Sequence, residues 1–249
     1  MSISWRIFSF FLAFLQVYAC YAEVIIHQDL NGNEAITDKT FPPLFVSLGS
    51  NCDVAYSLEF SGLRHAAFPL DWLLTIDGNK FIELIENGFQ HFLDEEFLAW
   101  NNHVLVNSYY HIEFRHDFEP LPELREKYQR RIDRFYKLNE YQGKVFFIRI
   151  PYIEATNPTL YWPNEEALQI STDWANRLNS VLKKCFPNLD FILVITNIFD
   201  ENDESDLILT DNILRINLAK YPRTDHESLL SKKLLKYVND PKLALENKH

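Results

Sequence analysis

The sequence lacks the motifs that usually reveal a metal or nucleotide site. It contains no Cys-x-x-Cys or His-Glu-x-x-His, and no phosphate loop or dinucleotide fingerprint, so it predicts neither a bound metal nor another cofactor. Repeats at the periods of solenoids or propellers are also missing. Basic residues are few: 24 Lys and Arg stand against 35 Asp and Glu, a net charge of −11. This charge argues against nucleic acid or an anionic membrane surface as the main partner, because both would repel it.

Cysteine is scarce as well, and one of the three cysteines lies in a predicted targeting segment. Residues 1–22 combine Arg6, a short apolar run and a small-residue cleavage signal that contains Cys20, which is typical of a secretory signal peptide. The apolar run is too short to favour a permanent membrane span. We therefore expect a secreted or periplasmic protein. Two alternatives are a lipoprotein anchored through Cys20 and an uncleaved anchor.

Cleavage would leave two cysteines, Cys52 and Cys185, in an oxidising compartment. Two cysteines there can form a disulfide, and this is the structural alternative to a reactive thiol. The rest of the chain divides into a leader segment over residues 23–43, a single domain over 44–240 and a tail over 241–249.

Apolar strands alternate with amphipathic helices along the predicted domain. Strands that are apolar on both faces require cover on both sides, which predicts an α/β fold with a central, largely parallel sheet and helices on both faces. The order of the strands is not readable. Predicted buried strands occupy 43–49, 145–150 and 190–196, further strands fall within 103–118 and 207–219, and helices occupy 52–63, 79–89, 122–144, 164–186 and 226–239.

Cys52 stands where the first buried strand turns into a helix. Loops at the carboxyl ends of parallel strands commonly carry the functional site. A helix N-terminus stabilises an anion, which favours the thiolate form of a cysteine. Gly49 and Ser50 let the backbone approach a substrate, and the N–H of Cys52 with the Asn51 amide could form an oxyanion hole. Alternatively, Asn51 simply caps the helix.

Three motifs give the chain a resemblance to a known family. They are Ser47 to Cys52 (S-L-G-x-x-C), Pro69 to Trp72 (P-L-D-W) and Phe114 to Phe118 (F-x-H-D-F). With the strand at 145–150, they resemble a bacterial family described as papain-like cysteine peptidases, over about residues 44–220. The resemblance implies that Cys52 is the nucleophile and His116 the general base.

Other residues compete for the roles beside Cys52. His65 and His111 are alternatives to His116. Asn197 follows a buried strand and is the candidate for orienting the imidazole, although an Asn there often caps a loop. Asp117 adjoins His116, and since neighbouring side chains of a strand point to opposite faces, it can orient that ring only if the pair lies in a turn.

Three further residues have both a functional and a structural interpretation. Asp71 could bind substrate or a histidine, or cap a turn, and Trp72 could form an apolar wall or belong to the core. Arg149 interrupts a buried strand, where a charge is costly unless it is paired. It could pair with Asp71 or Asp117, or bind an anionic group of the substrate.

The leading hypothesis is a secreted papain-like cysteine peptidase or a related acyl-transfer hydrolase that acts on a peptide, a cell-wall cross-link or a glycan ester. An esterase of the SGNH type is an alternative based on the fold alone. A non-catalytic extracytoplasmic binding module for peptide or glycan is the other, with a cleft floored by 47–52 and walled by Trp72, Tyr109 and Tyr110. An inert or disulfide-bonded Cys52 would favour the binding module.

Overall fold

The computed structural model describes residues 27–28, 34–35, 41–150, 170–199, 207–219, 230 and 232–236. The chain divides into two compact units, Met1–Pro42 and Pro43–His249. In the first unit, β1 (His27–Gln28) pairs antiparallel with β2 (Glu34–Ala35). The predicted signal segment, 1–22, and the predicted tail, 241–249, lie outside the described residues.

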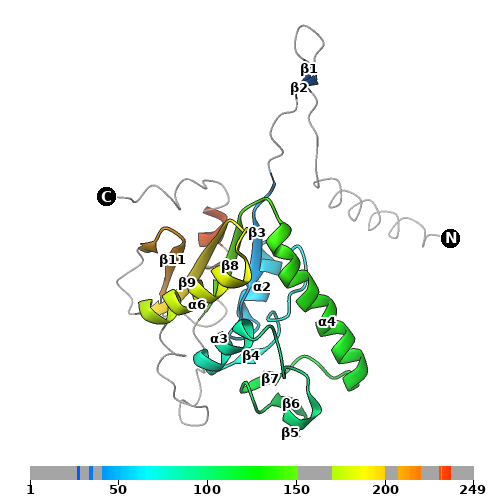
Figure 1. Cartoon of the computed structure of the whole chain (residues 1–249). Helices are drawn as coiled ribbons and strands as arrows, with labels where there is room; N and C mark the ends of the chain where they lie inside the picture. The colour runs from blue at the N-terminus through cyan, green and yellow to red at the C-terminus, as the bar shows by residue number, and fades with distance from the viewer. Residues whose placement is uncertain are drawn as a thin grey trace, which may run out of the picture. The chain divides into compact units, whose positions relative to one another are not determined.

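The second unit is built on a five-stranded sheet with the order β10-β11-β9-β8-β3 (Figure 1). Four of its strands run parallel, and only β10 at one edge is antiparallel to its neighbour. This confirms the predicted α/β fold with a largely parallel sheet. The strands are β3 (Leu44–Ser47), β8 (Val145–Arg149), β9 (Phe191–Phe199), β10 (Leu207–Thr210) and β11 (Ile213–Ala219).

Alternate residues of the central strands enter two separate hydrophobic clusters. Val46 and Phe147 belong to the larger cluster, whereas Phe45 and Phe146, their neighbours in the sequence, belong to the smaller one. A parallel sheet of this kind is apolar on both faces because helices cover both. The continuous apolar runs in the sequence are therefore a direct consequence of the architecture.

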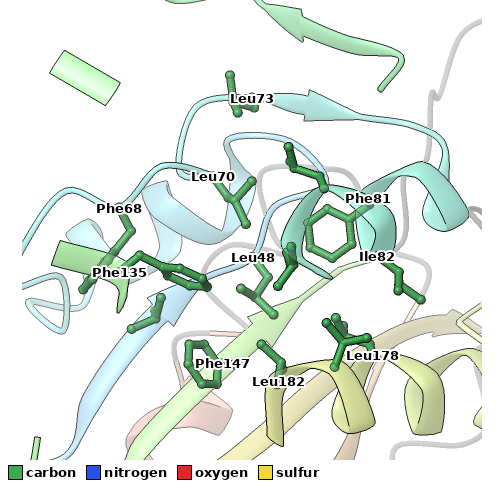
Figure 2. Close-up of a cluster of buried hydrophobic side chains, with 14 of the residues drawn as sticks. Leu48, Phe68, Leu70, Leu73, Phe81, Ile82, Phe135, Phe147, Leu178 and Leu182 are labelled. Atoms are coloured by element: carbon green, nitrogen blue, oxygen red, sulfur yellow. The ribbon is translucent and has the colours of Figure 1, made fainter. Parts of the chain in front are cut away.

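Helices cover each face of the sheet. On the face of the larger cluster lie α3 (Gly78–Glu86), α4 (Leu121–Lys137) and α6 (Thr172–Cys185). Figure 2 shows part of this cluster, with Leu48 and Phe147 among side chains of α3 and α6. The other face is covered by α2 (Asp53–Phe60) and by Leu230 and Leu234 near the C-terminus. None of the described helices has the length and apolar character that a membrane crossing needs.

A second, antiparallel sheet has the order β4-β7-β6-β5, and its strands come from just before α3 and from the segment between α3 and α4. Strands β6 and β7 confirm the strand pattern predicted within 103–118, whereas β4 and β5 were not predicted. The side chain of Asn107 fixes the turn between β6 and β7 by accepting the Tyr110 N–H at 2.8 Å. The strands are β4 (Leu74–Thr75), β5 (Leu98–Asn101), β6 (Val104–Asn107) and β7 (Ile112–Phe114).

Candidate functional site

Cys52 occupies the strand-to-helix junction that the sequence predicted. It is the N-cap residue of α2 and is half-buried. The N-terminal end of the helix dipole favours negative charge at this position, and so favours the thiolate. Cys52 and Cys185 are not joined in a disulfide, and Cys185 instead directs its thiol to the carbonyl of Ile85 at 3.8 Å. The disulfide alternative is therefore wrong for this structure.

The Asn51 side chain closes the start of α2. Its Oδ1 accepts the main-chain N–H of Asp53 at 3.0 Å, and its Nδ2 donates to the Asp53 carboxylate at 2.9 Å. Asn51 therefore satisfies the N–H of the first helical residue from the position before the N-cap, which is close to the capping role that the sequence left open. One amide N–H of Asn51 is thus used within the fold, so an oxyanion would depend mainly on main-chain N–H groups near Cys52.

The turn before Cys52 has an unusual backbone. Gly49 has φ +80°, and the peptide bond between Gly49 and Ser50 is cis. The Gly49 N–H donates to the Ser47 hydroxyl at 3.2 Å, and the Ser50 carbonyl accepts the Thr75 N–H at 2.7 Å. Ser50 is fully buried, and its hydroxyl has no hydrogen-bond partner within the described parts of the chain.

Arg149, at the end of β8, lies against this turn and forms no ion pair with the residues that the structure describes. Its Nη1 donates to the Leu48 carbonyl at 2.8 Å and to the Thr75 hydroxyl at 2.6 Å, and its Nη2 donates to the Thr75 carbonyl at 2.9 Å. The expected pairing with Asp71 or Asp117 is wrong, because Arg149 binds main-chain carbonyls and a hydroxyl. Burial lowers the pKa of Arg149 to about 9, which leaves it charged at neutral pH.

Asp71 is buried and bonded within its own loop. Its Oδ2 accepts hydrogen bonds from Arg64 Nη2 at 2.9 Å and from the Phe68 N–H at 3.0 Å. Burial raises the pKa of the Asp71 carboxyl, although the Phe68 N–H and Arg64 act in the opposite direction. Asp71 therefore holds the loop that carries Trp72, which is its structural interpretation.

Trp72 connects the helix of Cys52 to the turn of His116. Its ring centroid lies 4.9 Å from that of Tyr56 and 5.5 Å from that of His116, both in edge-on arrangements. Tyr56 stands one helical turn from Cys52, whose carbonyl accepts the Tyr56 N–H at 2.9 Å. Arg64 lies over the same indole at 5.3 Å. The half-buried Trp72 thus contacts both the first turns of α2 and the turn of His116, and its role as an apolar wall stays a prediction.

His116 is exposed and lies in the turn that follows β7. The neighbouring Asp117 does not serve its ring. Asp117 is 2% exposed, pairs with Lys127 and accepts the Tyr128 hydroxyl at 2.6 Å. Both of these partners belong to α4, so Asp117 anchors the His116 turn to that helix.

The rival histidines have separate positions. The Nδ1 atom of His111 lies 3.1 Å from the Asp77 carboxylate, and the other oxygen of that carboxylate caps α3 through the N–H groups of Asn79 and Lys80. His111 is therefore engaged at the start of α3. His65 is exposed in the loop after α2.

Asn197 lies near the carboxyl end of β9, within the strand and not after it as the sequence predicted. It is in β9 opposite Asn217, two residues beyond Ile195, which pairs with Arg149. Strand β8 lies between β9 and β3, and adjacent strands are about 4.8 Å apart, so about 10 Å separates the strand of Asn197 from the strand that leads to Cys52. The Asn197 side chain lies outside the described part of the structure, and its role stays a prediction.

The sequence-based candidates omitted two features. Thr75 contacts both Ser50 and Arg149, but a threonine in an apolar run carries no signal of such a role. His91, Asp94 and Glu96 each offer one possible metal ligand, and these atoms lie within 4.8 Å of one another. His91 Nδ1 already contacts the Asp94 carboxylate at 2.8 Å, and all three residues are accessible to solvent. This arrangement is that of a surface hydrogen-bonded pair with a carboxylate nearby, and no metal is assigned to it.

Comparison with known proteins places the chain in a family. Residues 43–201 match the family described as "putative papain-like cysteine peptidase", and the chain belongs to this family. An uncharacterized protein of Acanthamoeba polyphaga mimivirus, R408, is 29% identical. The match covers 43% of this chain and 60% of that protein. No solved structure matches. Since the relative is viral, the bacterial origin suggested by the motifs stays a prediction.

Proposed function

We propose that this protein is a cysteine-nucleophile hydrolase of the peptidase type, with Cys52 as the nucleophile and His116 as the group that carries the proton. The observation that carries the proposal is the position of the Cys52 thiol at the start of α2, connected through Tyr56 and Trp72 to His116. Membership of the peptidase-like family supports the same assignment.

In the proposed reaction, the Cys52 thiolate attacks the carbonyl carbon of the scissile bond and forms a carbon–sulfur bond. Main-chain N–H groups at the start of α2 stabilise the negative oxygen that results. The protonated His116 gives its proton to the leaving amine as the carbon–nitrogen bond breaks. Water, deprotonated by His116, then cleaves the thioester and restores the thiol.

The substrate class proposed is a peptide. Tyr56 is 42% exposed and forms an aromatic wall with Trp72 one turn from Cys52, which suits an apolar side chain beside the scissile bond. Secretion through residues 1–22 would place this activity outside the cytoplasm, where cell-wall peptides and glycan esters are also available. The peptide is preferred because the family is described by peptidase character.

The test is the pH dependence of Cys52 alkylation by iodoacetamide in the full chain, read by peptide mapping so that Cys20 and Cys185 are separated from it. We expect an apparent pKa well below the roughly 8.5 of an unperturbed thiol, and a changed profile in His116→Ala. His111→Ala is the matched control, because that ring is engaged with Asp77. An ordinary thiol profile that is identical in His116→Ala would contradict the catalytic role. Activity that survives Cys52→Ser would indicate esterase-like chemistry.

A second candidate function is a non-catalytic module that binds peptide or glycan. Exposed aromatic side chains favour it: Phe118 is 72% exposed two residues after His116, and Tyr56 is 42% exposed one helical turn from Cys52. Such rings can stack on an apolar or sugar surface. An unreactive Cys52 together with saturable ligand binding would support this function.

A further inference from the structure

The turn that leads to Cys52 is held on both sides by one pair of residues. Before Gly49, the Leu48 carbonyl accepts Arg149 Nη1 at 2.8 Å. After Gly49, the Ser50 carbonyl accepts the Thr75 N–H at 2.7 Å, and the Thr75 hydroxyl lies 3.5 Å from the same oxygen. Arg149 and Thr75 are themselves joined by hydrogen bonds of 2.6 and 2.9 Å. The two residues thus bracket the turn from opposite sides.

The guanidinium of Arg149 fits its site closely. It is 2% exposed, lies 4.0 Å from the ring centroid of Phe81 and has no carboxylate partner among the residues that the structure describes. A Cβ atom on Gly49 would come within 3.2 Å of Arg149 Nη1. A buried charge is costly, and planar guanidinium donors suit several fixed acceptors at once. Arg149 Nη1 and Nη2 donate to the Leu48 carbonyl at the turn and to Thr75.

We propose that Arg149 and Thr75 are positioning residues for Cys52. By fixing the carbonyls of Leu48 and Ser50, they set the direction in which the chain enters α2, and so the position of the thiol relative to the helix N-terminus. The inference rests on the proposed function of Cys52 and adds to it the residues that hold the nucleophile. Neither side chain needs to touch the substrate.

The test uses Thr75→Val, which keeps the shape of the side chain and removes only the hydroxyl, with Thr75→Ser as the variant that restores it. Arg149→Lys keeps a charge but replaces the planar fork by a single ammonium. Iodoacetamide alkylation of the full chain is followed against pH at Cys52 and at Cys185 in the same sample. Cys185 is the internal reference, because it lies at the end of α6 and contacts the Ile85 carbonyl and not the turn at Gly49. Its alkylation should become faster only if the fold loosens.

We expect Thr75→Val to slow Cys52 alkylation near pH 7 by about fivefold, because a rise of somewhat less than one unit in the pKa of the thiol lowers the thiolate fraction by that factor. The alkylation rate of Cys185 should stay unchanged, and Thr75→Ser should behave like wild type. Arg149→Lys should also slow Cys52 alkylation near pH 7. A wild-type Cys52 with a lowered apparent pKa that is unchanged in both Thr75→Val and Arg149→Lys would overturn the positioning role alone. Parallel changes at Cys52 and Cys185 would also overturn it, since they report general loosening. An ordinary wild-type Cys52 profile would overturn both this inference and the proposed function.

Discussion

The indole of Trp72 lies edge-on to the imidazole of His116, with 5.5 Å between the ring centroids and 63° between the ring planes. Tyr56 contacts the same indole at 4.9 Å from the first turns of α2. One aromatic ring therefore contacts both the helix of Cys52 and the turn of His116, through the edge-on geometry that aromatic pairs favour.

Replacing Trp72 tests both its contribution to stability and its role in positioning His116 relative to Cys52. We expect Trp72→Ala to lower the free energy of unfolding by about 2 kcal/mol, less than for a fully buried tryptophan because the ring is half-buried. It should also reduce the influence of His116 on Cys52 alkylation. Trp72→Phe, which keeps a ring, should retain most of both properties. If the His116-dependent part of the profile persists in Trp72→Ala, the ring does not position the histidine.

Two glycines allow the fit of Arg149 against the turn to be measured. Gly49 and Gly62 both have positive φ, +80° and +71°, so alanine at either position costs about 1–2 kcal/mol in backbone energy. A Cβ at Gly62 meets nothing within 4 Å, whereas at Gly49 it approaches Arg149. Urea unfolding should therefore show a larger loss for Gly49→Ala, and only that variant should change Cys52 reactivity. Equal losses of unfolding free energy in the two variants would mean that the Arg149 guanidinium moves away from an added Cβ at no cost.

Asp71 should give stability a definite pH dependence. Burial raises its folded-state pKa above the ordinary 3.8, so its contribution is fully present below the unfolded pKa and is lost as the pH rises through the folded pKa. The stability of wild type relative to Asp71→Asn should thus decrease as the pH rises above 3.8, the ordinary pKa of this group. Asp173→Asn, which removes an exposed carboxylate in the first turn of α6, is the control. A difference that grows with pH would show that the ion pair with Arg64 dominates over burial.

The anchoring of the His116 turn can be tested within α4. Tyr128 donates to the buried Asp117 carboxylate at 2.6 Å, whereas Tyr136 lies a long 3.4 Å from its acceptor, the Ile85 carbonyl. Tyr128→Phe should cost roughly 1–3 kcal/mol because it removes a hydrogen bond to a charged group. Tyr136→Phe should cost clearly less. Thermal or urea unfolding measures both, and similar losses would argue against a special role of Asp117.

The sequence predicted those elements of the fold whose hydrophobic pattern is contained within one segment of the chain. The apolar runs of β3, β8 and β9 and the periodicity of α3, α4 and α6 depend on nearby residues, and so does the place of Cys52 between β3 and α2. The short β4 and the largely exposed β5 have no such pattern and were missed.

The partners of charged side chains were not predictable in the same way. Arg149 binds main-chain carbonyls that are 74 and 101 residues distant, and every residue of any sequence offers a carbonyl. Asp117 and His116 are adjacent in the chain, yet packing against α4 directs the carboxylate away from the imidazole. The expected pairing of Arg149 with Asp71 or Asp117 therefore failed, and the turn at His116 did not bring Asp117 to the imidazole.

The contacts around Gly49 also determine when the site can exist during synthesis. The strand that leads to Cys52 is made early, but the donors that fix its turn come 25 and 101 residues later. Contacts of such long separation form only after the intervening chain has collapsed. A nascent chain that stops before Arg149 thus contains Cys52 without the Arg149 contacts that hold its turn. Enhanced reactivity of this thiol should therefore be acquired at the end of folding and be absent from unfinished chains.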